Sequence, residues 1–98
     1  MLTIRQSAHS ISITGHANYA EPGKDIVCAA VSTLALTLMY SIDELTDDYI
    51  KSVSEPGNMN IEFITLSDGS KLLVESFMLG VQAMAENYPE NIIVEKAP

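Results

Sequence analysis

Two side chains in this sequence can carry nucleophilic chemistry: Cys28, the only cysteine, and His16, one of two histidines. A cysteine attacks a carbonyl as its thiolate, and a nearby imidazole can take the thiol proton and return it to a leaving amine. His16 precedes Cys28 by twelve residues, so the two meet only if the intervening segment folds back. A lone cysteine in an apolar helix is also commonly a small buried hydrophobe. Spacing alone leaves both interpretations open.

The segment after residue 24 predicts a helix that presents Cys28 in its first turn. Asp25 can cap this helix, because its carboxylate accepts from the free N–H groups of the first turn. Those N–H groups favour a thiolate and are expected to hold the oxyanion of an acyl-transfer reaction. Asp25 is also the nearest candidate to orient His16. Ser32 lies one turn after Cys28 and is interpreted as a helix-interior hydroxyl. The expected core stripe is Val27, Val31, Leu34 and Leu38.

The residues before this helix predict a hairpin and a loop. Apolar residues alternate with polar ones over residues 2–4 and 11–13, with a turn at 7–9 between them. Residues 15–24 have no periodicity, and Pro22-Gly23 is a strong turn signal. His16 is therefore expected at the end of a strand, with a loop leading from it to the helix.

The second half of the chain predicts a second hairpin, a helix and a last strand. The strands are expected at 49–54 and 60–66, around a turn at 55–58, after an acidic linker at 43–48. Residues 67–70 either turn the chain or cap the next helix. That helix has Gly80 in its interior, Pro89 ends it, and a short strand follows at 91–96. Its expected apolar stripe is Leu73, Phe77, Val81, Met84 and Tyr88.

This order of elements, β-β-α-β-β-α-β, predicts an α+β fold in which two helices pack on one face of a small, mostly antiparallel sheet. Ninety-eight residues are expected to form a single domain, 1–98. The content of 47% hydrophobic and 18% charged residues favours a homo-oligomer, in which a second copy covers part of the apolar surface.

Charge and composition restrict the partners. The net charge of -8 disfavours nucleic acid and suits a basic protein partner. One cysteine and two histidines fall short of a zinc site, so we expect no metal and no cofactor. We expect no secretory signal at the N-terminus, and the apolar segment 26–40 is expected to be too short to span a bilayer. The lone cysteine fits a reducing cytoplasm.

Two motifs at a fixed separation resemble the signature of the ribosomal-processing cysteine protease family, Prp. The first motif is Gly15-His16-Ala17, and the second runs from Gly23 through Asp25 and Cys28 to Ser32. The later part of the chain, Gly80 and then residues 88–92, is similar to the family's second helix and last strand. Residues 43–60 match no pattern of the family.

The resemblance implies a small homodimer that uses a Cys-His dyad to remove an N-terminal extension from a large-subunit ribosomal protein. Phage-associated relatives are thought to process virion proteins such as capsid or scaffold. By position, Cys28 would be the nucleophile and His16 the general base, with Asp25 and Ser32 in support. The substrate loop, the family's mobile cover, would include Ala17, Asn18, Tyr19 and Gly23.

Two other classes of protein fit the same residues less well. A non-catalytic dimeric adaptor could bind a peptide in the same groove. A cysteine phosphatase is disfavoured, because no glycine-rich phosphate cradle and arginine follow Cys28.

Overall fold

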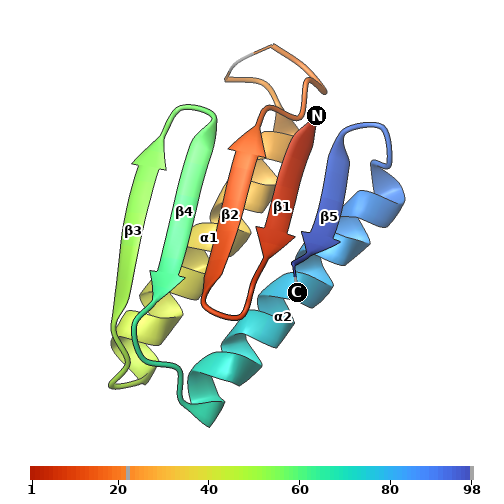
Figure 1. Ribbon diagram of the computed structural model, residues 1–98. Helices are drawn as coiled ribbons and strands as arrows, with labels where there is room; N and C mark the ends of the chain where they lie inside the picture. Colours follow the sequence, from red (N-terminus) through yellow and green to blue (C-terminus); the bar gives the residue numbers. More distant parts are fainter. Residues whose placement is uncertain (22, 98) are drawn as a thin grey trace.

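The amphipathic segments of the sequence assemble into two layers in the computed structural model, which describes residues 1–21 and 23–97. The order of elements is the predicted one, and the two helices lie side by side on one face of the sheet (Figure 1). The bounds are β1 (Leu2–Gln6), β2 (Ser10–Gly15), α1 (Ile26–Leu45), β3 (Ile50–Glu55), β4 (Asn58–Phe63), α2 (Asp68–Asn87) and β5 (Ile92–Lys96). Pro22 lies outside the described residues, so the structure does not test its part in the predicted turn.

The five strands form one sheet in the order β3-β4-β2-β1-β5. Every neighbouring pair is antiparallel except β1 and β5, which are parallel. The predicted fold class, a mostly antiparallel sheet with two helices on one face, is confirmed. β2 ends and β5 begins at the same end of the molecule, so the loop after β2 and the connection before β5 both lie there (Figure 1).

The core lies between the sheet and the helices, and β1, β2, β4 and β5 contribute buried side chains to it. Their buried side chains are Leu2, Ile4, Ile11, Ile13, Ile61, Phe63 and Ile92. In α1 the buried stripe is Val27, Val31, Ala35, Leu38 and Ile42. Leu34, expected in this stripe, is only half-buried, because it faces α2: a Cβ built on Gly80 would lie 3.2 Å from Leu34 Cδ1. Gly80 therefore allows the two helices to approach closely.

The stripe predicted for α2 is only partly right. Phe77 and Val81 are buried, and Val74 and Met78 join them. The other predicted members, Leu73, Met84 and Tyr88, pack at the edge of the core.

The predicted acidic linker at 43–48 is wrong in its first half. Asp43 and Glu44 belong to the last turn of α1, because the helix continues to Leu45. The helix is also longer than the apolar segment suggested. With 20 residues and a mean hydropathy of 1.7, α1 is long and apolar enough to cross a membrane by length and composition alone. The expectation that this segment is too short for a bilayer is therefore not upheld, although its buried face packs in the core as predicted.

Asp48 forms hydrogen bonds with the start of α2 and is not a solvated linker residue. Its carboxylate accepts from the N–H of Ser67 at 2.8 Å, from the Ser67 hydroxyl at 2.6 Å and from the buried Ser70 hydroxyl. The hydrogen bonds from the Ser67 hydroxyl, the Ser70 hydroxyl and the Ser67 N–H lower the pKa of Asp48 to about 2. Ser67 in turn caps α2, so residues 67–70 begin the helix.

The β3–β4 hairpin has a tighter turn than the sequence suggested. Glu55 pairs with Asn58, which leaves Pro56 and Gly57 as the two turn residues, and β4 therefore begins at Asn58 instead of residue 60. Gly57 has a φ of +73°, the left-handed conformation that suits such a turn. This turn lies at the same end of the sheet as the loop after β2 (Figure 1).

Candidate active site

Cys28 lies in the first turn of α1, as predicted, because Asp25 caps this helix. Asp25 Oδ1 accepts from the N–H groups of Val27 and Cys28, each at 3.0 Å. Backbone N–H groups at the helix start were expected to hold the oxyanion, but those of Val27 and Cys28 donate to Asp25 instead. The cap thus uses two of the donors that the helix start would otherwise offer to a substrate.

A backbone N–H group of the loop donates to the thiol sulfur. The N–H of Ala17 points at Cys28 Sγ with an N to S distance of 3.4 Å. The Ala17 side chain is 1% exposed, so this residue is a buried support under the loop and not a surface that a substrate can touch. The carbonyl of Ala17 accepts from Asn91 Nδ2 at 2.9 Å.

The second oxygen of Asp25 holds the loop. Asp25 Oδ2 accepts from the N–H groups of Tyr19 at 3.0 Å and Ala20 at 3.3 Å, so one carboxylate joins the loop to the helix start. Asn18 takes a positive φ of 56° as the chain bends around this carboxylate. Desolvation raises the pKa of Asp25, but the four N–H donors together outweigh it and leave the pKa below its ordinary value. Asp25 therefore stays ionised as an anchor for the loop.

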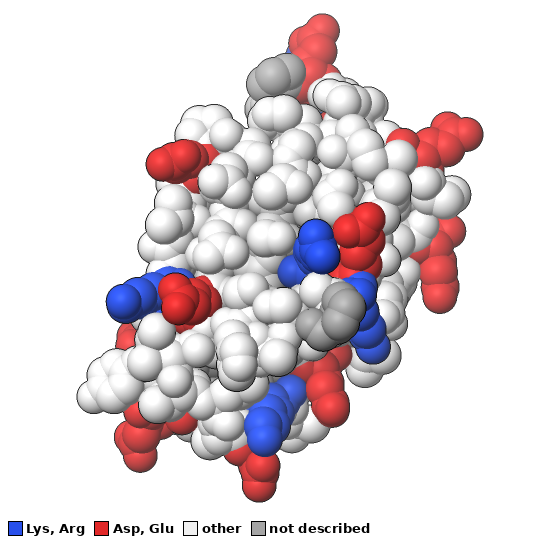
Figure 2. All heavy atoms as spheres, in the orientation of Figure 1, with Lys and Arg blue, Asp and Glu red and all other residues white. Residues whose placement is uncertain are grey.

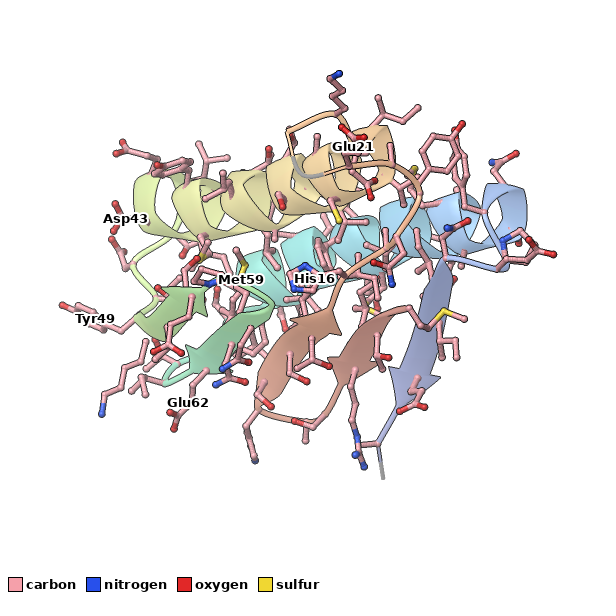
Figure 3. All side chains as sticks on the ribbon, turned by 90° about the horizontal axis from the view of Figure 1, so that it is seen from above. His16, Glu21, Asp43, Tyr49, Met59 and Glu62 are labelled. Carbon is pink, nitrogen blue, oxygen red and sulfur yellow. The ribbon has the colours of Figure 1, made fainter. Side chains whose placement is uncertain are left out.

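His16 follows β2 directly and is exposed at the end of the strand. Figure 3 shows it beside Met59 of β4, on the side of the sheet that carries the helices. A Cβ built on Gly57 would lie 3.0 Å from His16 Nε2 and 3.3 Å from Cε1, so the imidazole rests against the turn of the β3–β4 hairpin. The N–H of Gly15 fixes this contact by donating to the Gly57 carbonyl at 2.9 Å.

Within residues 1–21 and 23–97, no side chain forms a hydrogen bond with the imidazole. Asp25, the candidate orienter, is instead occupied by backbone N–H groups.

His16 and Cys28 line the same two cavities. The larger, of about 610 Å³, lies on the loop side, where Asn18, Gly23 and Lys24 contribute to its wall. The smaller, of about 240 Å³, lies between the start of α1 and the β3–β4 turn. Ser32, the other predicted supporting residue, lines both cavities, so its side chain faces the groove. The pair thus stands between two depressions that an extended peptide can occupy.

Of the predicted loop residues, Asn18 and Gly23 line the larger cavity, Ala17 is buried, and Tyr19 lies outside the cavity lining. Its ring packs edge-on against Tyr88 at the end of α2, with centroids 5.3 Å apart and an interplanar angle of 86°. This contact ties the loop to the second helix.

The sequence interpretation missed two contributors to the site, Gly57 and Asn91. A Pro-Gly turn and the connection from Tyr88 to Ile92 were visible in the sequence, but nothing local showed that they reach His16 and Ala17. Among the described residues, no group of three or more His, Cys, Asp and Glu side chains is arranged to hold a metal ion.

Comparisons with known proteins agree on one family. The model of the family described as cysteine protease Prp matches residues 1–93. The ribosomal processing cysteine protease Prp of Staphylococcus aureus (strain NCTC 8325 / PS 47) is 31% identical over 85 residues, covering 84% of this chain and 80% of the relative. That of Bacillus subtilis (strain 168) is 29% identical over 103 residues, covering 94% and 92%.

Solved structures show the same fold. The essential ribosomal processing protease Prp from S. aureus, in complex with a covalently linked product peptide, superposes with a TM-score of 0.94 at 24% identity, covering 99% of this chain and all of that one. The protein SMU.848 from Streptococcus mutans superposes with a TM-score of 0.73 at 34% identity, covering 97% and 90%. The match to the family model includes both motifs around His16 and Cys28.

Proposed function

This chain belongs to the Prp family of cysteine proteases, and from that premise we propose that it removes a short N-terminal extension from a large-subunit ribosomal protein. The relatives it matches are named ribosomal processing proteases. The observation that carries the proposal is the placement of His16 and Cys28 on the walls of the same two cavities, with the Ala17 N–H directed at the sulfur.

In the proposed reaction, His16 takes the thiol proton and the thiolate of Cys28 attacks the scissile carbonyl carbon. The tetrahedral intermediate collapses as His16 gives its proton to the leaving amine, which departs as the new N-terminus. Water, deprotonated by His16, then hydrolyses the thioester and releases the carboxylate product. Two cavities flanking the pair leave room for the peptide on both sides of the cut.

The charge of the chain supports a basic substrate. The net charge is -8, and on the sheet face in Figure 2 the few Lys and Arg side chains alternate with Asp and Glu and form no continuous basic surface. This distribution favours a basic ribosomal precursor over direct contact with nucleic acid. A virion precursor, capsid or scaffold, is the other candidate substrate. Cleavage assays with the two purified precursors distinguish them.

We place the protein in the cytoplasm as a homodimer. From Ile26 to Ile42, α1 carries no charged residue, and its solvent side exposes Ile26, Leu36 and Tyr40, with fractions of 57%, 42% and 66%. A second copy would cover this uncharged face, whereas a membrane would compete with the core for the buried face. Sedimentation of the purified chain tests the dimer.

The proposal is tested with Cys28→Ala and His16→Ala in cleavage of a peptide that spans the ribosomal processing site. Each substitution should abolish cleavage and leave the circular dichroism spectrum unchanged. His9→Ala is the matched control, because His9 is exposed in the turn between β1 and β2 at the opposite end of the sheet. Full cleavage by Cys28→Ala would overturn the proposal. A wild-type chain that binds the peptide without cutting it would favour the adaptor.

A further inference from the structure

We propose that Asn91 is a positioning residue for Cys28, acting through the Ala17 peptide. The inference rests on the proposed function, because it assigns the thiolate as the reacting species. It adds a residue from the far end of the chain, 74 positions after Ala17, to a site built from residues 16–32.

The Asn91 side chain holds the loop at the residue that contacts the sulfur. Asn91 Nδ2 donates to the Ala17 carbonyl at 2.9 Å, and the N–H of Ala17 points at Cys28 Sγ at 3.4 Å. The Ala17 side chain is buried, whereas the next four residues of the loop, 18–21, are exposed. Ala17 is therefore the point where the loop is fixed to the body of the protein.

Asn91 is itself rigidly placed. Its carbonyl accepts from the Leu2 N–H at 2.8 Å, and its own N–H donates to the Tyr88 carbonyl at 3.0 Å. The first hydrogen bond attaches Asn91 to the start of β1, and the second attaches it to the end of α2. Asn91 thus connects the loop to both the sheet and the second helix.

The chemical effect follows from the charge of the acceptor. A hydrogen bond from a backbone N–H to a thiolate is stronger than one to a neutral thiol, so a correctly placed Ala17 N–H favours the ionised form. The N–H groups of Val27 and Cys28 at the helix start do not replace it, because they donate to Asp25. Without the Asn91 donor, the Ala17 carbonyl loses its partner and its peptide can rotate away from the sulfur.

The test compares Asn91→Ala and Asn91→Asp with wild type. Aspartate has the shape of asparagine but no N–H to donate at neutral pH. The readout is the rate of alkylation of Cys28 by iodoacetamide at pH 6.5 divided by the rate at pH 9.5, together with kcat and KM for the peptide. Loss of one hydrogen bond to the loop should lower the ratio and kcat by about two- to tenfold. KM should change less.

Asn87→Ala and Asn87→Asp are matched controls, because Asn87 Nδ2 donates to the Ala83 carbonyl within α2 instead of to the loop. Both should keep the wild-type ratio. Folded Asn91 variants with the wild-type ratio would overturn the positioning role. A wild-type ratio as low as that of glutathione, with cleavage retained by Cys28→Ala, would instead overturn the proposed function.

If the Asn91 variants do not fold, the same inference is tested on the unaltered protein. In ¹⁵N-labelled wild type, the amide proton of Ala17 and one Nδ2 proton of Asn91 should both shift as the thiol ionises. Constant shifts for both across the titration would refute the coupling.

Discussion

Replacement of Gly57 by alanine tests how His16 is held. The imidazole has no hydrogen-bonded orienter among the described residues, and the surface it rests on is the backbone of Gly57. An added Cβ would lie 3.0 Å from Nε2, closer than the 3.4 Å at which ordinary contacts begin. The ring must therefore move by about 0.4 Å or more to accommodate Gly57→Ala.

Two costs are expected from this substitution, and they are separable. The positive φ of 73° costs a non-glycine residue about 1–2 kcal/mol of folding stability, partly offset by the lower entropy of the unfolded alanine chain. Displacement of a general base lowers kcat, since misplacement by about 1 Å costs on the order of 100-fold. We expect Gly57→Ala to unfold at a lower temperature and to lose at least about sixfold in kcat.

Gly57→Asn separates the two costs, because asparagine tolerates positive φ but also carries a Cβ. If the contact with His16 determines the activity, both variants lose kcat, while Gly57→Asn keeps more stability. The measurements are thermal melts and steady-state cleavage of the processing peptide. Near-wild-type kcat in folded Gly57→Ala would refute the contact as the device that places His16. If Gly57→Asn keeps full activity and Gly57→Ala does not, the loss of kcat in Gly57→Ala comes from backbone strain.

The two aspartate anchors give the remaining predictions. Asp25→Ala should cost about 0.5–2 kcal/mol as a lost helix cap, the same range as Ser67→Ala in α2. Only Asp25→Ala should also reduce kcat, because Asp25, unlike Ser67, also holds the loop; equal activity of the two variants in the peptide assay would contradict this role. The pKa of Asp48 is lowered from 3.8 to about 2 in the folded state, so its stabilising contribution is present above about pH 3.8 and is lost as the pH falls to about 2. Asp48→Asn should flatten the pH dependence of the urea midpoint in that window, and an unchanged slope there would disprove the assignment.

The sequence predicted the elements because their determinants are local. Alternating apolar residues identified both hairpins, and the period of the helices identified both amphipathic stretches. The position of Cys28 in a first turn followed from Asp25 alone, since capping depends on residues two and three positions away. Errors arose where an end depends on a distant partner. Asp48, for example, belongs to the cap region of α2 although 19 residues separate it from Ser67.

The assembly of the site could not be predicted in the same way, because its contacts join segments far apart in the chain. No periodicity relates His16 to Gly57, or Ala17 to Asn91. The parallel pairing of β1 with β5 creates the second contact, since it places Asn91 next to Leu2. Motif spacing predicted the reacting residues, whereas the residues that contact them appear only in the fold.

The position of Asp25 changes where the thiolate gains its stability. A free helix start would favour the anion through its N–H groups, but here Asp25 accepts from two of them and adds a negative charge of its own. Other favourable groups near Cys28 include His16, Lys24 and the N–H of Ala17, and all three residues belong to the segment between β2 and α1. In the proposed reaction, activation of Cys28 therefore depends on the conformation of this loop as well as on the helix. The reactivity of Cys28 would therefore differ between a conformation in which the loop closes over a peptide and one in which the loop moves away from it.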